Sequence, residues 1–192
     1  MTRIMRDSAV AAHVPVGGTQ LVAGYVNGSY AWTAADWNRF PGIHHITIDV
    51  IGDRPDADVL DVETGDATPE GAVQWVRNKL ARHEPYAPVL YCNRSTLTPL
   101  FDAMQAAGYH VVQHFRLWIA TLDGTQKTND MTGVTAVQYA GEKTTGGNYD
   151  QSIVYDDAWK AIPSNVLHGI LVQLPGGGTK ALSSSDGGKT WS

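Results

Sequence analysis

The chain has a single cysteine, Cys92, and therefore cannot form an internal disulfide. Cys92 lies in a strand-like stretch, where we interpret it as a small buried hydrophobic residue. Apolar runs are short, and none approaches the roughly 18 residues needed to cross a bilayer. Residues 1–10 carry positive charges but lack the apolar segment of about 7 to 15 residues found in signal peptides. We expect no membrane partner and no cleaved signal peptide.

Basic residues are also scarce, with 14 lysines and arginines against 19 aspartates and glutamates, a net charge of -5. An acidic surface repels nucleic acids and anionic membranes, so no nucleic acid is expected as a partner. No glycine-rich loop ends in Lys-Ser or Lys-Thr, and no Cys/His cluster has zinc spacing. His44 and His45 are adjacent, so on a strand they would point to opposite faces. The sequence therefore predicts no cofactor and no metal site.

Short apolar runs alternate with turn-rich segments and a few helical patterns, an order typical of βα units. Strands are expected near residues 3–7, 20–25, 44–50, 57–63, 88–92, 115–120, 134–139 and 149–154. A helix is expected behind Thr68, which can cap it, with Pro69 at the first helical position. A second helix is expected after Ser95, and a shorter one over Ala34 to Phe40.

Eight strands suggest a barrel, but a regular (β/α)8 barrel needs at least about 200 residues. The link from Val50 to Ala57 is shorter than the roughly twelve residues of a helical crossover. Segments after residue 120 show almost no helical periodicity. We therefore expect an α/β fold, an irregular TIM-like barrel over residues 1–164 whose later strands are joined mainly by loops. Active sites of such barrels lie at the carboxyl ends of the strands.

The composition changes from about residue 165, where glycine-rich turns separate short apolar stretches. We expect residues 165–192 to form a C-terminal β-hairpin extension of two or three strands. Its last part, Ser184-x-Asp186-x-Gly188-x-Thr190-Trp191, resembles the Asp-box hairpin of sialidases and other β-propellers. A single copy favours a structural hairpin, with a contact surface for an assembly or a glycan as the alternative.

Two carboxylates one residue apart, Asp61 and Glu63, follow an apolar pair and precede a turn. On a strand, alternate side chains share a face about 6.5 to 7 Å apart, so both acids would project together and repel each other. Such repulsion raises at least one pKa and lets one acid stay protonated while the other is ionised, as acid/base catalysis requires. A solvated edge strand and a pair that binds a metal such as Mg2+ are the alternatives. Asp7 and Asp150 stand at other predicted strand ends and would face the same mouth.

These acids belong to an ordered set of motifs: IMRDS, LDVETGD, PVLYCN, LWIA, AVQYAG and GGNYDQS. In this order the motifs resemble those of the glycoside hydrolase family 25 lysozymes and related lysozyme-like proteins of actinobacteria and their phages. The resemblance covers about residues 3–160. It implies an irregular (β/α)5β3 barrel that cleaves the β-1,4 bond between N-acetylmuramic acid and N-acetylglucosamine, with peptidoglycan glycan strands as the partner.

By matching motif, the resemblance implies that Glu63 is the proton donor and that Asp61 holds and tunes it. Asp150 and Asp7 would stabilise positive charge at the anomeric carbon or orient the acetamido group of the substrate. The resemblance also implies four residues lining the sugar groove: Tyr91, Trp118, Gln138 and Tyr139. Core packing is the alternative for the tryptophan and for the first of these tyrosines.

The chain departs from the family in Ile46-Thr47-Ile48-Asp49-Val50, which lacks the family's Tyr-His-Phe-like signature. An expected substrate-binding aromatic is thereby missing, and Asp49 either enters the site or is a solvated strand-end acid. The leading hypothesis is a lysozyme-like glycosidase at the bacterial cell wall, released by lysis or carried on a phage particle. The alternative is a catalytically degenerate barrel, a structural or glycan-binding module of a phage virion or other assembly that oligomerises through its C-terminal hairpins.

Overall fold

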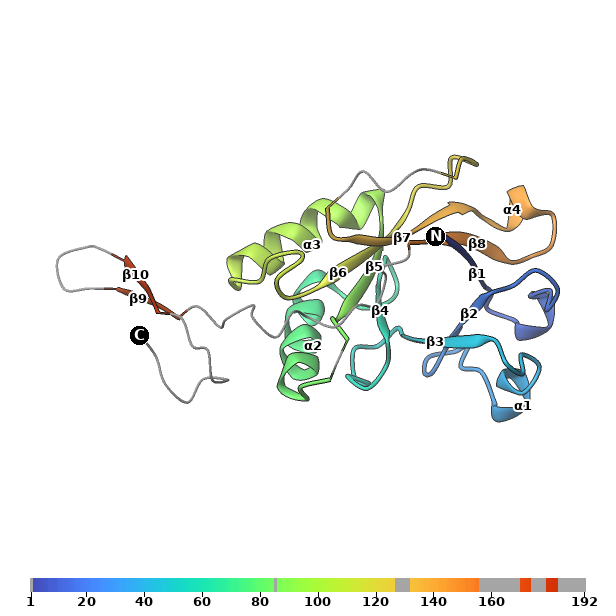
Figure 1. The fold of residues 1–192 in the computed structure, drawn as a ribbon, viewed down its shortest axis with the longest axis horizontal. Coiled ribbons are helices and arrows are strands. Elements are labelled where there is room, and N and C mark those ends of the chain that lie inside the picture. The colour runs from blue at the N-terminus through green and yellow to red at the C-terminus, as the bar shows by residue number, and fades with distance from the viewer. Residues whose placement is uncertain (1, 85, 127–131, 156–169, 174–178, 183–192) are drawn as a thin grey trace. The chain divides into compact units, whose positions relative to one another are not determined.

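In this computed structural model, the described part of the chain comprises residues 2–84, 86–126, 132–155, 170–173 and 179–182 (Figure 1). The chain divides into two compact units, residues 1–160 and residues 161–192. In the second unit, β9 (Ile170–Gln173) pairs antiparallel with β10 (Thr179–Leu182). The Asp-box-like segment at residues 184–191 lies outside the described residues.

The first unit is a closed barrel whose eight strands are neighbours in chain order (Figure 1). Its strands are β1 (Arg3–Asp7), β2 (Leu21–Tyr25), β3 (His44–Asp49), β4 (Val59–Val62), β5 (Val89–Asn93), β6 (Arg116–Ala120), β7 (Val134–Ala140) and β8 (Asp150–Val154). Neighbouring strands from β1 to β7 are parallel, whereas β8 runs antiparallel to β7 and β1 and closes the barrel. The expected α/β barrel and its eight strands are confirmed.

Helices are few, as the weak helical periodicity of the sequence indicates. The connections contain the 3-10 helix η1 (Ala11–His13) and the α-helices α1 (Ala34–Trp37), α2 (Pro69–Ala81), α3 (Arg94–Ala106) and α4 (Glu142–Thr145). In the described part of the barrel, only α2 and α3 are long, with 13 residues each. The link between β3 and β4 carries no helix, as expected from its length. No helix in the described ranges is long and apolar enough to cross a membrane.

Each long helix begins at a side-chain cap. Thr68 accepts a hydrogen bond from the Gly71 amide at 3.1 Å, and Pro69 occupies the first turn of α2, as expected. The cap of α3 is Asn93, whose side chain accepts a hydrogen bond from the Ser95 amide at 2.8 Å. This helix starts earlier than expected, because Asn93 both ends β5 and caps the helix that follows.

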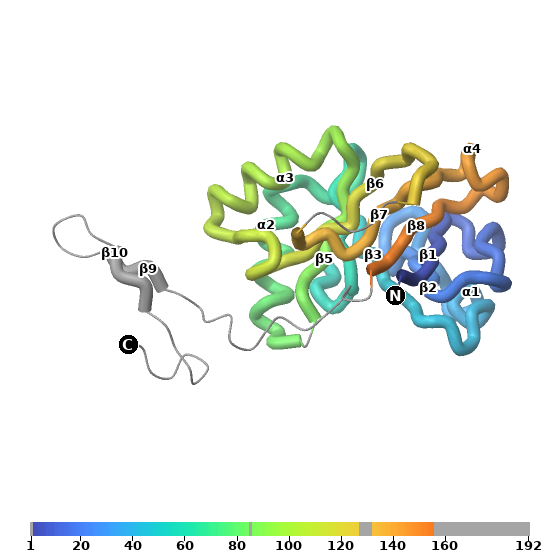
Figure 2. The backbone as a smooth tube through the Cα atoms, turned by 45° about the horizontal axis from the view of Figure 1, so that its top comes forward, coloured from blue at the N-terminus to red at the C-terminus, as the bar shows by residue number. Residues whose placement is uncertain are grey.

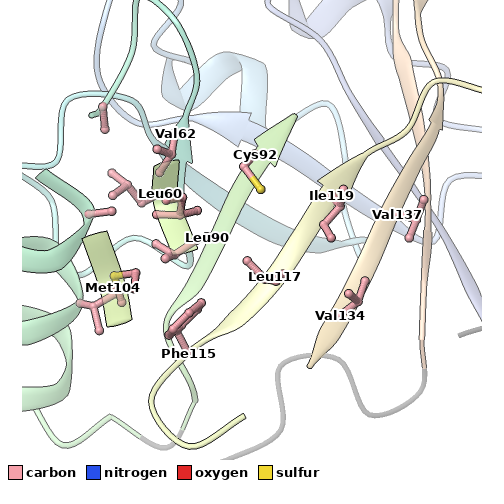
Figure 3. Packing of buried hydrophobic residues seen from close by; sticks show 14 of the residues in the cluster. Leu60, Val62, Leu90, Cys92, Met104, Phe115, Leu117, Ile119, Val134 and Val137 are labelled. Atoms are coloured by element: carbon pink, nitrogen blue, oxygen red, sulfur yellow. The ribbon is translucent and has the colours of Figure 1, made fainter. Parts of the chain in front are cut away.

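Alternation along the strands divides the core of the barrel into an inner and an outer layer. The inner layer consists of Met5, Leu21, Ala23, Ile46, Ile48, Val59, Val89, Trp118, Ala136 and Val154. The outer layer, shown in Figure 3, packs the long helices against the strands and includes Leu60, Val62 and Cys92. In Figure 2, α2 and α3 lie side by side on one flank of the barrel. Because Leu60 and Val62 face these helices, Asp61 and Glu63 face the barrel interior.

Candidate active site

A small pocket of about 80 Å³ lies where the parallel strands end. Its lining residues are Asp7, Tyr25, Ile48, Asp61, Glu63, Tyr91, Trp118 and Asp150. The pocket therefore unites the four acids that the sequence singled out, although they come from three different strands or strand ends. Two of the expected aromatic residues line it as well.

The strands β1 and β8 supply one pair of acids. Because β8 runs antiparallel to β1, Asp150 at the start of β8 pairs directly with Asp7 at the end of β1. Asp150, which begins its strand, therefore lies at the same mouth of the barrel as Asp7, which ends its strand. Asp7 is buried, whereas Asp150 is partly open and is hydrogen-bonded by the Gln138 side chain.

The other pair comes from β4, which contains Asp61, and from the turn after it, which contains Glu63 and adds a fifth acid, Asp66. The Asp66 amide donates to the Glu63 carbonyl at 3.1 Å, and the Ala67 amide donates to the Asp61 carbonyl at 3.2 Å. Gly65 lies between Glu63 and Asp66 in this turn and has a φ of 104°, a conformation that a glycine adopts without steric cost. This tight turn returns the chain toward β4 and brings Asp66 to the acid pair.

Burial makes the two innermost acids hard to ionise. Desolvation raises the pKa of Asp7 well above 3.8, and the neighbouring Asp150 and Glu63 raise it further. Desolvation also raises the pKa of Asp61 well above 3.8, with the charge of Glu63 as the next contribution. Within the described residues, Asp7 and Asp61 each keep one buried carboxyl oxygen without a hydrogen-bond partner. The folded barrel thus holds unsatisfied acid groups at its centre, a costly arrangement that function often explains.

Opposing interactions set the protonation of Glu63, which is half-buried. Desolvation raises the pKa of Glu63 above its ordinary value of 4.5, and the nearby charge of Asp66 adds to the rise. Hydrogen bonding from the side chains of Asn93 and Tyr91 acts in the other direction and lowers the pKa. The net shift is upward, so Glu63 keeps its proton to a higher pH than a free glutamate does.

The carboxylate oxygens of Asp61, Glu63 and Asp66 lie within 4.8 Å of one another. Three carboxylates at this spacing either share protons or hold a divalent cation. Desolvation raises the pKa of all three, so each keeps its proton to a higher pH than a free carboxyl group does. We interpret the cluster as an acid/base group.

Aromatic side chains form the rest of the pocket wall. The ring of Tyr91 meets the ring of Trp118 edge-on, with centroids 4.9 Å apart, and the Trp118 indole donates to the Ser152 hydroxyl at 3.0 Å. Trp118 is 1% exposed, so it belongs to the inner core and also lines the pocket. Burial raises the pKa of Tyr25 and Tyr91 above the ordinary value of 10, so both hydroxyls keep their protons and can donate hydrogen bonds.

The two expected groove residues on β7, Gln138 and Tyr139, lie on opposite faces of the strand, and neither lines the pocket directly. Gln138 is buried and reaches the pocket indirectly, through its hydrogen bond to Asp150. Tyr139 belongs to the outer layer, where its hydroxyl accepts hydrogen bonds from the side chains of Gln126, at 2.8 Å, and Gln151. Adjacent residues of a strand face opposite sides, so Gln138 and Tyr139 cannot both face the barrel interior.

Asp49 is neither in the pocket nor solvated, so the structure corrects both expectations for this residue. It is fully buried and accepts hydrogen bonds from the Asn27 side chain at 2.7 Å and the Trp75 indole at 3.0 Å. Backbone amides of the following loop also donate to it, those of Ile51, Gly52 and Arg54. Asp49 therefore organises the loop between β3 and β4.

Three residues near the acids, Tyr25, Asp66 and Asn93, have no role in the expectations from sequence. Tyr25 and Asn93 end strands and Asp66 closes the turn after one, the same positions that marked the expected acids. Strand-end position was therefore the available signal. The register between neighbouring strands decides which strand-end residues point into the barrel mouth, and this register cannot be predicted from the sequence.

No model of a known protein family matches the sequence, and no curated protein matches it. Two solved structures are similar in fold. One, described as an uncharacterized B. stearothermophilus protein, has a TM-score of 0.52 and 13% sequence identity, over 81% of this chain and 97% of its own. The other is a family 25 glycosyl hydrolase from Bacillus anthracis, with a TM-score of 0.52 and 12% identity, over 80% of this chain and 88% of its own. At these identities the similarity shows the fold, an irregular barrel like that of a family 25 glycosyl hydrolase.

Proposed function

We propose that the protein is a glycoside hydrolase in which Glu63 is the general acid. The observation that carries this proposal is the convergence of Asp7, Asp61, Glu63 and Asp150 on one pocket at the carboxyl mouth of the barrel. Cleavage of an acetal requires a protonated acid at the leaving oxygen and an ionised carboxylate near the anomeric carbon or the attacking water. Acids that share a pocket cannot all ionise together, so protonated and ionised groups coexist there.

The positions of the acids suit different roles. Glu63 is more open than Asp61 and has a raised pKa, so it can reach a bound substrate and still carry a proton. Asp61 lies deeper and favours the protonated state of Glu63 by charge repulsion whenever it is itself ionised. Burial raises the pKa of Asp150, and the hydrogen bond from Gln138 opposes that rise and favours the ionised form, which would stabilise positive charge at the anomeric carbon.

The substrate we propose is a β-1,4-linked glycan with N-acetylated sugars, the glycan strand of peptidoglycan. The order of the sequence motifs and the similarity to the fold of a family 25 glycosyl hydrolase support this choice. Tyr25 and Tyr91 combine an aromatic face, which packs on the C–H surface of a pyranose, with a protonated hydroxyl that can donate to a sugar oxygen or an acetamido carbonyl.

Release of reducing ends from purified peptidoglycan tests the proposal. We expect wild-type protein to release them and Glu63→Gln to lower kcat by roughly a hundred- to ten-thousandfold, the usual contribution of a general acid. Glu70→Gln, at an exposed position of α2, is the matched control and should behave as wild type. Equal release by wild type and Glu63→Gln would refute the assignment, and binding of peptidoglycan without release by wild type would indicate a glycan-binding module instead.

A further inference from the structure

Asn93 joins two elements at the mouth of the barrel, because it is both the last residue of β5 and the cap of α3. Its side-chain oxygen accepts hydrogen bonds from the Ser95 amide at 2.8 Å, the Ser95 hydroxyl at 2.6 Å and the Thr96 amide at 3.2 Å. A backbone amide can only donate, so these bonds identify Oδ1 as the atom that faces the helix. The Nδ2 group, with its two N–H donors, must then face away from the helix.

The register between β4 and β5 places this nitrogen near Glu63. Val62 and Cys92 are the last pair of the parallel ladder, so Glu63 and Asn93 are the residues that directly follow this pair on the two neighbouring chain segments. Cys92 packs in the outer layer, and its two neighbours on β5 therefore face inward, toward the pocket. In agreement with this placement, side-chain hydrogen bonding from Asn93 lowers the pKa of Glu63, the effect of a donor on a carboxylate.

We propose that Asn93 is a positioning residue that donates a hydrogen bond from Nδ2 to Glu63 and stabilises the charge formed there during proton transfer. This inference rests on the proposed function. When the O–H bond of Glu63 breaks, the proton forms a new O–H bond on the leaving oxygen and the electron pair stays on the carboxylate. The Asn93 donor is already in place for that charge, because the cap of α3 fixes its side chain before the reaction begins.

The variants Asn93→Asp and Asn93→Ser separate this role from helix capping. Aspartate and serine cap helices about as well as asparagine, but an ionised aspartate has no donor and the serine side chain is too short to replace the amide. We expect kcat to fall roughly ten- to hundredfold with KM changed less than about twofold, the cost of a lost hydrogen bond to a developing charge. We also expect the alkaline limb of the kcat/KM profile to move to higher pH, because Glu63 then holds its proton more tightly.

Thr68→Ala is the matched control, because it removes the cap of α2 without altering a donor to Glu63. We expect Thr68→Ala to lower the stability of the protein without moving the alkaline limb. An unmoved limb in both Asn93 variants would overturn the inference while leaving the glycosidase proposal standing.

Titration of the Glu63 side-chain carboxyl by carbon-13 NMR in the full-length chain gives a readout that needs no activity. The pKa of Glu63 should be higher in Asn93→Asp and Asn93→Ser than in wild type, and equal values in all three proteins would overturn the inference. Because this measurement requires no turnover, it tests Asn93 even if the protein cleaves no glycan.

Discussion

Single buried acids in the pocket lower the stability of the barrel at neutral pH. Desolvation raises the pKa of Asp61 well above 3.8, so the folded protein binds the proton more tightly than the unfolded chain does. The resulting stabilisation is complete below about pH 3.8 and is lost as the pH rises through the higher pKa of the folded state. At neutral pH the buried carboxyl therefore destabilises the barrel relative to a neutral group of the same shape.

Asp61→Asn should raise the free energy of unfolding at pH 7 by about 1 to 2 kcal/mol, because the amide needs no ionisation in a buried site. The gain should shrink as the pH falls toward about 4, where Asp61 is protonated in the wild type. Urea unfolding at both pH values measures it, with Asp102→Asn at an exposed position of α3 as the control. Destabilisation at pH 7, or a gain that does not depend on pH, would contradict the assignment of Asp61 as a buried acid.

Asp66→Asn should move the alkaline limb of the pH–activity profile to lower pH. The charge of Asp66 raises the pKa of Glu63, so its removal lets Glu63 lose its proton earlier. This shift is opposite in sign to that expected for the Asn93 variants. A limb that moves upward in Asp66→Asn, or stays in place, would show that Asp66 does not tune the proton donor.

Strand-end position singled out the four acids that line the pocket, but it could not separate them from Asp49. All five acids lie at or within one residue of the end or the start of a strand, so a one-dimensional pattern treats them alike. The difference lies in what surrounds them: Asp49 is occupied by amides of its own loop and by Asn27 and Trp75. The acids of the pocket have fewer partners, and only the folded structure shows this.

At the scale of elements, the loop between β3 and β4 depends on one side chain. Asp49→Ala should lower the free energy of unfolding by about 3 kcal/mol, because several buried donors lose their acceptor together. Asp53→Ala is the control, since Asp53 is exposed and accepts a hydrogen bond from the same Asn27 side chain; its cost should stay below about 1 kcal/mol. Thermal or urea unfolding measures both variants. Similar losses of stability in the two would contradict the prediction that the hydrogen bonds to Asp49 stabilise the loop.

The elements themselves were largely predictable because periodicity and caps are local properties of the sequence. The α2 cap at Thr68 and the strand positions follow from patterns a few residues long. The start of α3 was less predictable, because Asn93 belongs to a strand and to a helix cap at once. The antiparallel pairing of Asp150 with Asp7 was not readable, since it depends on contacts between distant parts of the chain.

For the whole molecule, the closed barrel is what brings distant residues to one mouth. Residues of the first and last strands meet because β8 closes on β1, and β4 contributes its acids from the middle of the chain. The inner apolar layer packs the barrel strands together, and the acids lie at the mouth of the barrel beyond this layer. At 12 to 13% identity, the similarity to the two solved structures lies in the barrel fold.

A chelator should leave the activity of the whole protein unchanged. The proposed reaction uses carboxyl groups alone, so incubation with EDTA followed by the peptidoglycan assay should give the wild-type rate. Restoration of a lost rate by added Mg2+ or Ca2+ would contradict our interpretation of Asp61, Glu63 and Asp66 as an acid/base cluster.

The most direct measurement is mass spectrometry of the fragments formed from purified peptidoglycan in water enriched in heavy oxygen. Hydrolysis of the glycosidic bond adds one oxygen from water to each new reducing end. The proposed function predicts labelled reducing ends with the wild-type protein and with Glu70→Gln, and a loss of them with Glu63→Gln. Fragments without label, or no fragments from the wild type anywhere between about pH 4 and 7, would contradict it.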